Sequence, residues 1–466
     1  MKNNQNNKIF EAFAISPIDG RYYQQISFLS EFFSEFALIK SRILVEILWF
    51  HFLVGENSPI GIKIDDEIHK KLDQYFEKFS IEEFFKFKEL ESNLRHDVKP
   101  VEYLLKNIVD KDSKEFLHFG LTSEDVTNIA YAINFKNYKE KYLIPNLKSI
   151  ILKLKDLSLS SKSLTILGHT HGQSATPTTF GKEIAYFIER INKSLNIIKN
   201  IKIEAKLSGA VGNLAALKIA YPKVNWIEQA NRFIESIGLS NSNVTKQIEP
   251  HDWICRICNE IALLSSICID LCKDIWLYGC LNYLKQKPKE GEVGSSTMPH
   301  KVNPIDFENC WGNMEITIAL SQLFSRKLPV TFMQRDLSDS TVLRNFGLIF
   351  GHFELGLKNL SLGLDKIIFN NEYIEKELES HPEVLAEAIQ TILRKNKVNN
   401  SYELLKDATR GKDITYDSLL SLINSCYIEE EDKKRIMNLK VKDYIGESVQ
   451  IVEKICRKIE KEIEKK

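Results

Sequence analysis

The sequence predicts an all-α protein, with shorter helical regions on either side of a long central helical bundle. Only twelve prolines occur in 466 residues, and they leave long proline-free stretches at 178–221, 251–287 and 383–466. Apolar residues recur at helical spacing within these stretches, whereas alternating patterns and Asn-Gly hairpin turns are scarce. No glycine-rich phosphate loop follows a strand-like segment, and no repeat of fixed period is present.

The chain reads as three helical regions with soft boundaries. Residues 1–115 mix shorter helices and loops, and residues 116–365 hold the long helices and most candidate site residues. The last region, 366–466, is rich in Lys and Glu and ends in EKICRKIEKEIEKK, which is typical of a solvated helix with opposite charges at helical spacing. We therefore expect three helical domains.

Two segments of the central region carry the strongest helical signal. Within Phe180–Leu207, apolar residues recur at steps of three and four, which predicts one buried face of a long helix. These residues are Ile184, Phe187, Ile188, Ile191, Leu195 and Ile198. Ile254–Leu284 is apolar on more than one face, so we expect a central, buried helix there.

Composition and charge favour a small-molecule partner. Lys+Arg and Asp+Glu both number 63, so the formal net charge is zero. Nucleic acid or a membrane surface as the main partner would favour a basic excess, and neither is expected. Charged residues interrupt the most apolar region, so no membrane span is expected. The N-terminal MKNNQNNKIFEAF lacks an apolar signal core, which indicates a cytoplasmic protein.

Eight cysteines lie in the C-terminal half, and Cys255 and Cys258 form a CxxC pair. A zinc site would need a second pair of ligands at metal spacing. These cysteines instead stand among Ile, Leu and Trp in a helical pattern, where free Cys behaves as a small hydrophobe. We expect buried packing, with zinc binding as the alternative, and no disulfide framework.

The most informative stretch is GSSTMPHKVNPIDFEN, residues 294–309. It gathers two hydroxyls, a lysine, an asparagine and a glutamate between glycines and two prolines. Pro299 and Pro304 favour short non-helical pieces, and polar loops of this kind often carry chemistry. An ordinary surface connection is the alternative from composition alone.

This stretch resembles the mobile loop of the fumarase/aspartase superfamily, and it is most similar to the adenylosuccinate lyase family in its bacterial long-chain form. HFGLTSEDVTN at 118–128 and GHTHGQSATPTTFGKE at 168–183 resemble two further blocks of the superfamily. The resemblance implies elimination of fumarate from a succinyl group and a fumarase/aspartase-like fold. It also implies three helical domains, 1–115, 116–365 and 366–466, with a central bundle that assembles into a homotetramer.

Eliminating fumarate requires a base, an acid that protonates the leaving nitrogen, and donors aimed at the charge that develops on a carboxylate. A histidine titrates near neutral pH, so His171 is a candidate acid by residue type, with a structural loop histidine as an equal alternative. The resemblance implies that His171 is the general acid and that Glu308 orients it. It also implies that Ser295 is the base that removes the carbon proton.

The resemblance also implies a set of substrate-binding residues. Thr122 and Ser123 read locally as a helix N-cap, and a helix N-terminus is itself an anion site. By residue type alone, Lys301, Arg335 and Arg344 would be surface charges. The implied set is Arg21, Tyr22, Arg95, His96, Asp97, Thr122, Ser123, Gln247, Ser296, Lys301, Asn303, Arg335, Ser340, Thr341 and Arg344.

Within this set the resemblance implies two groups. Thr122, Ser123, Ser296, Lys301 and Asn303 would hold the succinyl carboxylates, and Gln247 would contact the succinyl or amide region. The nucleotide would bind to Arg21, Arg335, Ser340 and Arg344, and His96 would lie near its phosphate. The implied substrates are adenylosuccinate and SAICAR, the succinyl-carboxamide ribonucleotide of purine synthesis, with no metal or organic cofactor.

Three departures from the family pattern stand in the chain. His169 takes the place of a usual Arg, and Arg95 that of an Asn. Trp311, within Cys310-Trp311-Gly312-Asn313, is bulkier than the usual residue. Two rival functions follow: the same elimination on another amine, such as argininosuccinate, and a binding protein that has lost catalysis. The presence of Ser295, His171 and Lys301 together argues against the second rival.

Overall fold

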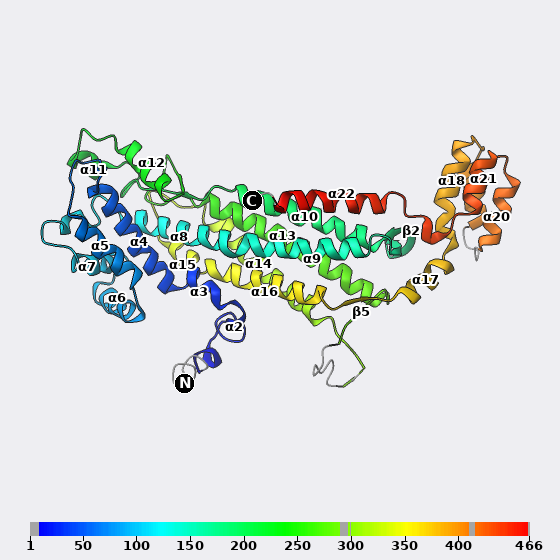
Figure 1. Ribbon diagram of the computed structural model, residues 1–466, viewed down its shortest axis with the longest axis horizontal. Coiled ribbons are helices and arrows are strands. Elements are labelled where there is room, and N and C mark those ends of the chain that lie inside the picture. The colour runs from blue at the N-terminus through cyan, green and yellow to red at the C-terminus, as the bar shows by residue number, and fades with distance from the viewer. Residues whose placement is uncertain (1–8, 289–296, 299, 410–414, 465–466) are drawn as a thin grey trace. The chain divides into compact units, whose positions relative to one another are not determined.

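The structure is a computed structural model that describes residues 9–288, 297–298, 300–409 and 415–464 (Figure 1). By its internal packing the chain divides into two compact units, each described by itself below. Unit 1 comprises Met1–Asn146, Ser194–Ser266 and Gly312–Gly356, and unit 2 comprises Leu147–Lys193, Ile267–Trp311 and Leu357–Lys466. The three domains expected from the sequence stay a prediction.

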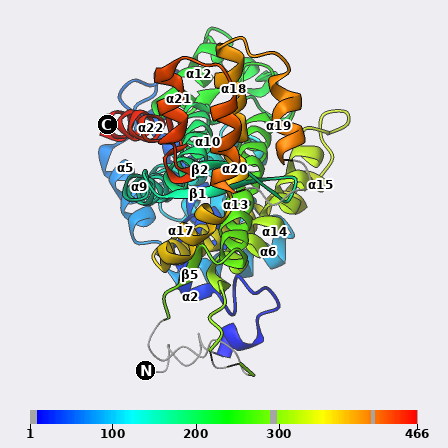
Figure 2. The same cartoon turned by 90° about the vertical axis from the view of Figure 1, so that its right-hand side faces the viewer.

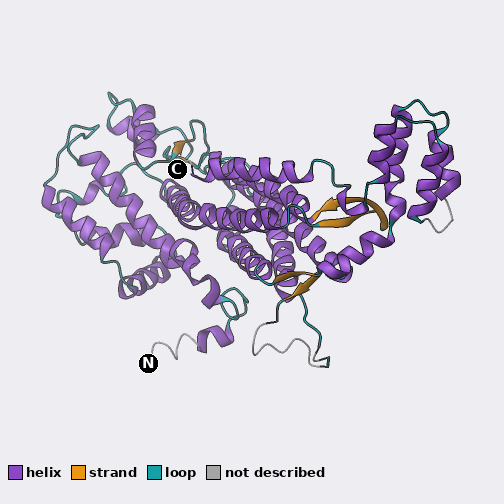
Figure 3. Ribbon diagram, turned by 45° about the vertical axis from the view of Figure 1, so that its right-hand side comes forward, coloured by secondary structure: helices purple, strands orange, loops and turns teal. Residues whose placement is uncertain are grey.

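Helices dominate both units, and strands are few and short (Figure 3). The helices confined to unit 1 are α2 (Tyr23–Ile26), α3 (Ser30–Phe33), α4 (Glu35–Val54), α5 (Asp66–Glu77), α6 (Ile81–Leu94), α7 (Lys99–Lys106), α8 (Ser123–Tyr138), α11 (Ala215–Ala220), α12 (Trp226–Ser236) and α15 (Ser338–Leu343). Those confined to unit 2 are α17 (Asn371–Ser380), α18 (Ala386–Lys395), α19 (Ser401–Thr409), α20 (Tyr416–Ser425), α21 (Glu430–Met437) and α22 (Ser448–Glu464).

Five long helices begin in one unit and end in the other. They are α9 (Ile144–Ser160), α10 (Phe180–Asn200), α13 (Asp252–Cys280), α14 (Ile305–Lys327) and α16 (Phe346–Leu364). The all-α prediction with long helices in the central region is therefore confirmed. Among the described residues, none of the helices combines the length and the apolar character needed to cross a bilayer.

The helices predicted within Phe180–Leu207 and Ile254–Leu284 are confirmed, and both end earlier than the predicted segments. All six apolar residues of the predicted face of α10 are buried. The helix stops at Asn200, and just beyond it the ammonium of the buried Lys139 donates to the carbonyl of Ile201 at 3.3 Å. Helix α13 stops at Cys280, and Asn282 follows with a left-handed backbone (φ 63°) that a helix cannot continue through.

In unit 1, α4 packs along α8. The hydroxyl of Ser41 donates to the side-chain oxygen of Asn134 at 2.6 Å, which fixes the register of the pair. Below them Phe135 of α8 stacks against Trp253, Phe346 and Phe350 with ring centroids 5.2 to 5.5 Å apart. Aromatic packing of this kind supplies much of a core's stability, and here it anchors the C-terminal part of α8 in the core of unit 1.

In unit 2, α22 packs against α9 and α10, and Figure 2 looks along these helices. Val452 and Cys456 lie on Ala185 and Leu159, and Lys155 pairs with Glu460 at 3.0 Å. The prediction of a solvated helix is thus wrong for one face of α22. An i,i+4 pair such as Arg457–Glu453 marks the exposed face, but the Val/Cys/Ile stripe is buried.

In the part of the chain that the structure describes, six short strands form three two-stranded sheets. Antiparallel β1 (Thr165–Thr170) and β2 (Gln173–Thr179) form a hairpin, β3 (Glu204–Ala205) and β4 (Ser240–Asn241) are parallel, and β5 (Leu284–Gln286) and β6 (Ile367–Phe369) are antiparallel. The hairpin falls on the GHTHGQSATPTTFGKE block, within the central region for which the sequence predicted helices. Its β-branched residues and the left-handed pair His171-Gly172 (φ 55° and 73°) favour a tight hairpin turn instead.

Candidate functional site

A cavity of about 540 Å³ in unit 1 brings together nine of the predicted substrate-binding residues. The nine are Arg95, His96, Asp97, Thr122, Ser123, Gln247, Arg335, Ser340 and Arg344. The other lining residues are Arg42, Glu91, Val98, Glu124, Thr127 and Leu337. Five separate segments supply the lining, so the gathering is a product of the fold and not of the sequence order.

The N-terminus of α8 forms one wall of the cavity. Thr122 is its N-cap, and the Asp125 carboxylate accepts the Thr122 amide at 2.9 Å, as the acidic first turn predicted. Asp125 also accepts the amides of Ser208 and Gly209 at 2.9 and 3.1 Å. Thr122 and Ser123 are therefore held at a helix end whose free amides and dipole favour an anion.

His96 has a fixed tautomer when neutral. Its Nδ1 accepts the backbone amides of Val98 and Lys99, both at 3.1 Å, so it caps the start of α7. Because Nδ1 is an acceptor there, the proton of the neutral ring is on Nε2. His96 can therefore offer one N–H donor to a ligand in the cavity while its other nitrogen is engaged.

The Asp97 carboxylate pairs with two arginines. Arg42 donates to the Asp97 carboxylate and to its backbone carbonyl, both at 2.9 Å, and Arg344 lies 3.7 Å from the same carboxylate. Burial disfavours the Asp97 charge, but the Arg42 guanidinium outweighs it and holds the pKa of Asp97 below its usual value. Asp97 thus positions cations and is not itself the group that meets an anion.

Arg335 projects between two buried acids. Its guanidinium lies 3.3 Å from Glu124, 3.6 Å from Asp339 and 3.4 Å from the Gln247 side-chain oxygen. Behind it, the buried His251 lies 3.7 Å from Asp339 and 3.5 Å from Glu249. Both terminal nitrogens of Arg335 are thus engaged by neighbouring side chains, which restrains the guanidinium at the cavity wall, where its charge favours an oxyanion.

The six lining residues outside the predicted set were missed by sequence reasoning, among them Arg42 and Glu124. Arg42 is buried on α4 next to Lys40 and Ser41, and no motif singled it out. No local pattern indicated the burial of Glu124, or that of Asp339 beside Arg335. Their burial, 3% and 2% exposed, is set by distant segments.

Three predicted residues of unit 1 do not line this cavity: Arg21, Tyr22 and Thr341. Arg21 is exposed, with its guanidinium 5.8 Å from the Tyr22 ring, and Thr341 is exposed on α15. Their assignment to the substrate stays a prediction. Arg344, in contrast, also borders a second, smaller cavity of about 260 Å³ with Phe33 and Tyr131.

The predicted acid, His171, lies in unit 2 at the first position of the two-residue turn between β1 and β2. The side chain is exposed there, and the hairpin pairs Thr170 with Gln173 immediately beside it. His169 is one register step back, with its ring 6.3 Å from that of Tyr283. The turn presents His171 outward from unit 2.

The 294–309 stretch is only partly described. Ser295 and Ser296 lie outside the described residues, while Lys301 is exposed. Helix α14 begins at Ile305, immediately after Pro304, so the expected non-helical run is wrong for its last residues. Proline suits the start of a helix, and Asp306 and Glu308 favour its first turn.

Glu308 accepts a hydrogen bond from the indole of Trp276 at 3.4 Å, and the described contacts of this single chain include none between Glu308 and His171. The predicted pairing of Glu308 with His171 stays a prediction. Trp311, one of the departures, lies on α14 with the Lys273 ammonium 4.4 Å from its ring centroid. The bulky ring is thus accommodated by a cation–π contact.

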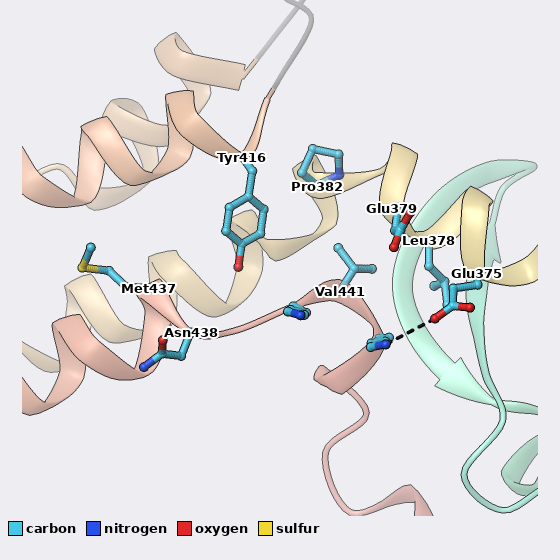
Figure 4. A pocket seen from close by; sticks show the side chains of 10 residues that line it. Glu375, Leu378, Glu379, Pro382, Tyr416, Met437, Asn438 and Val441 are labelled. Atoms are coloured by element: carbon cyan, nitrogen blue, oxygen red, sulfur yellow. Dashed lines mark hydrogen bonds and ion pairs between the residues drawn. The ribbon is translucent and has the colours of Figure 1, made fainter.

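Unit 2 contains another cavity of about 390 Å³, seen in Figure 4. Tyr416, Met437 and Val441 form apolar walls, and Lys442 pairs with Glu375 at 3.3 Å. None of its described lining residues is a predicted site residue. The predicted binding residues that the structure brings together line the unit 1 cavity, whereas the predicted acid His171 lies in unit 2.

The CxxC cysteines lie on α13, and both Cys255 and Cys258 are buried, so the predicted packing role is confirmed. Burial raises the pKa of Cys255 to about 12, which keeps this thiol protonated. Within the described part of the chain, no group of three or more His, Cys, Asp or Glu is arranged to hold a metal ion.

Comparison with known proteins identifies the family. The Lyase family matches residues 20–317, and the family "Adenylosuccinate lyase C-terminal" matches residues 331–445. The chain is 42% identical over 448 residues to the adenylosuccinate lyase of Buchnera aphidicola subsp. Schizaphis graminum, covering 95% of this chain and 98% of that protein. It is also 42% identical over 448 residues to that of Dictyostelium discoideum, covering 93% and 96%.

The fold points the same way. A crystal structure of a fumarate lyase from Mesorhizobium sp. BNC1 superposes with a TM-score of 0.75 at 16% identity, covering 92% of this chain and 97% of that one. The likeness at this identity concerns the fold alone. Sequence identity over nearly the full chain and two matching family descriptions together show that the chain belongs to the adenylosuccinate lyase family of lyases.

Proposed function

We propose that this chain catalyses the β-elimination of fumarate from adenylosuccinate, giving AMP, and from SAICAR, giving the carboxamide ribonucleotide, in purine nucleotide biosynthesis. The observation that carries the proposal is the unit 1 cavity. It joins a helix N-terminus, a histidine of fixed tautomer and two restrained arginines in one space. This is the set that a phosphorylated dicarboxylate would need.

The nucleotide phosphate would bind Arg335 and Arg344, with Ser340 beside them. Arg335 is held by two acids and Arg344 by Asp97, so both guanidinium groups are oriented before substrate arrives. Preorganised cations of this kind cost little reorganisation at the moment of binding. His96 would donate its Nε2–H near the phosphate, and Arg95 would add a further cation at this rim.

The succinyl carboxylates would bind at Thr122 and Ser123, where the N-terminus of α8 supplies donors, and at Ser296, Lys301 and Asn303. Gln247 lines the cavity and would contact the succinyl or amide region. Its side chain is positioned there by Ala210, whose carbonyl accepts from the amide nitrogen at 3.0 Å, and by Arg335, which donates to the amide oxygen. Donors at both carboxylates stabilise the carbanion, which delocalises its charge into one of them.

In the proposed elimination, Ser295 gains one proton and His171 gives one up. The Ser295 oxygen, as alkoxide, takes the proton from the carbon adjacent to one carboxylate, and the electron pair left on that carbon forms the new C=C bond. The C–N bond breaks, and the nitrogen takes a proton from His171. Fumarate and the amine are released, and exchange of one proton from Ser295 to His171 through solvent restores both groups. No metal or organic cofactor takes part in this proposal.

Assembly as a homotetramer would complete the site. Helix α13 exposes Leu263 and Leu277 to 47% and 51%, and α14 exposes Ile316 to 44% in the single chain. Apolar side chains on the long helices are the surface that bundled copies would cover. The His171 turn and the Ser295 loop, each from a different copy, would then meet the cavity, in a cytoplasmic enzyme.

The test is incubation of the purified chain with adenylosuccinate, with the products identified and the molar mass measured by light scattering. Formation of AMP and fumarate in equal amounts by a tetramer supports the proposal. Turnover of argininosuccinate but not of adenylosuccinate would contradict the nucleotide assignment. Tight AMP binding without turnover of any of these substrates would indicate a binding protein instead.

A further inference from the structure

Glu124 is the one acid of the cavity wall whose carboxylate is both buried and half unused. It is only 3% exposed, and its Oε1 has no hydrogen-bond partner, while its other oxygen lies 3.3 Å from Arg335. It stands in the first turn of α8, next to Ser123, and lines the cavity. A buried carboxylate oxygen without a partner is costly while the group is charged, and a proton on the carboxyl lowers that cost.

The charges around Glu124 come from several elements. Arg335 stands just before α15, and Asp339 lies within that helix. His251 precedes α13, and Lys206 follows β3. Arg335, His251 and Lys206 favour the charged form of Glu124, whereas Asp339 disfavours it. Burial is the dominant influence and raises the pKa of Glu124 to about 7.

An anion that binds Arg335 changes this balance. Arg335 is the nearest cation to Glu124, and it is already shared with Asp339 at 3.6 Å. A doubly charged phosphate monoester on that guanidinium would take up much of its positive charge and would add negative charge beside Glu124. Both effects disfavour a second carboxylate there, whereas a protonated Glu124 removes the repulsion and gains an O–H donor.

We propose that Glu124 is a positioning residue that holds Arg335 while the cavity is empty and takes up a proton when a phosphate monoester binds to Arg335. The inference rests on the proposed function, because that function places the nucleotide phosphate at this arginine. It makes nucleotide affinity dependent on pH through a group that touches Arg335 rather than the reacting atoms.

The sign of the effect follows from linkage. The bound phosphate raises the pKa of Glu124 further, so binding takes up protons wherever the empty cavity still holds Glu124 charged. Affinity for the dianion therefore falls as pH rises above the value of about 7. A phosphate monoester loses its second proton with a pKa near 6, so at pH 8 the ligand itself contributes little to proton exchange.

The experiment is calorimetric titration of the full-length protein with AMP at pH 8, in buffers that differ in ionisation enthalpy. The slope against that enthalpy counts the protons taken up. We expect the wild type to take up on the order of 0.5 proton per site more than Glu124→Gln, which keeps the shape but cannot titrate. Glu91→Gln is the matched control, because Glu91 also lines the cavity but pairs with Lys88.

The outcomes separate this inference from the proposed function. AMP binding with equal proton uptake in the wild type and Glu124→Gln overturns the inference and leaves the function standing. Loss of the uptake in Glu91→Gln as well as in Glu124→Gln also overturns it. Failure of the wild type to bind AMP overturns both.

A measurement on the wild type alone covers the case in which Glu124→Gln does not fold. Between pH 7.5 and 8.5 we expect the Kd for AMP to rise several-fold, with about tenfold as the limit for a single proton. A Kd that is constant across this range overturns the inference.

Discussion

The ammonium of Lys206 lies 2.8 Å from the carboxylate of Asp125, and neither side chain has any exposure to solvent. Asp125 is the residue that accepts the Thr122 amide at the start of α8. The ion pair therefore fixes the helix end at which we place the substrate carboxylates, and it is the natural starting point for tests of the site.

Lys206→Met should destabilise the protein strongly. It leaves Asp125 charged and buried without its cation, and removal of one partner from such a pair costs about 3–5 kcal/mol. Denaturant unfolding followed by circular dichroism measures the change. Lys71→Met is the matched control, because Lys71 pairs with Glu67 in an exposed i,i+4 bridge and should give a far smaller change. Equal changes in the two variants would contradict the structural role of Lys206.

Two substitutions of His96 should separate its role as a helix cap from its role in binding the ligand. In His96→Asn the side-chain oxygen can still accept the amides at the start of α7, whereas the Nε2–H is lost. We expect near-normal melting temperature and a drop in kcat/KM of about 10- to 100-fold, as for a lost hydrogen bond to a charged group. His96→Ala should lose the cap as well, with about 1 kcal/mol of stability. Normal kcat/KM in His96→Asn would remove His96 from the phosphate.

Ser295→Ala and His171→Asn should each reduce kcat by about 10²–10⁴-fold, because each removes one proton-transfer group. AMP binding should persist in both variants. If the site joins residues from different copies, a refolded mixture of the two inactive variants should regain part of the activity, since some sites then contain both wild-type residues. A mixture with no gain would place Ser295 and His171 in the same copy.

His251 should make stability depend on pH in the alkaline range. Burial works against its charge, but Asp339 and Glu249 outweigh burial and raise the pKa of His251 to about 9. A folded-state pKa above the unfolded value of 6.5 means that the stabilisation is complete below that value. It is lost as pH rises through 9. The melting temperature of His251→Gln should therefore fall less between pH 7 and 10 than that of the wild type; parallel curves would contradict this.

Helices and site blocks were largely predictable from local sequence. The apolar spacing in α10, the acidic first turn of α8 and the proline before α14 act through neighbours within one or two helical turns. The His171-Gly172 turn shows the limit of that approach. Its hairpin needs two strands to pair, and strand pairing depends on residues that helical periodicity does not weigh.

The sequence by itself thus determined the fold class, the helical segments and the family blocks, because periodicity, helix caps and loop motifs are properties of short stretches. Only the tertiary structure decided that Arg95, Thr122, Gln247 and Arg335 line one cavity. It also decided that Arg42 holds Asp97 and that Glu124 is buried with a free oxygen. Burial and charge pairing depend on which distant segments pack together, and that packing fixes both the pKa of a carboxyl and the ligand it can meet.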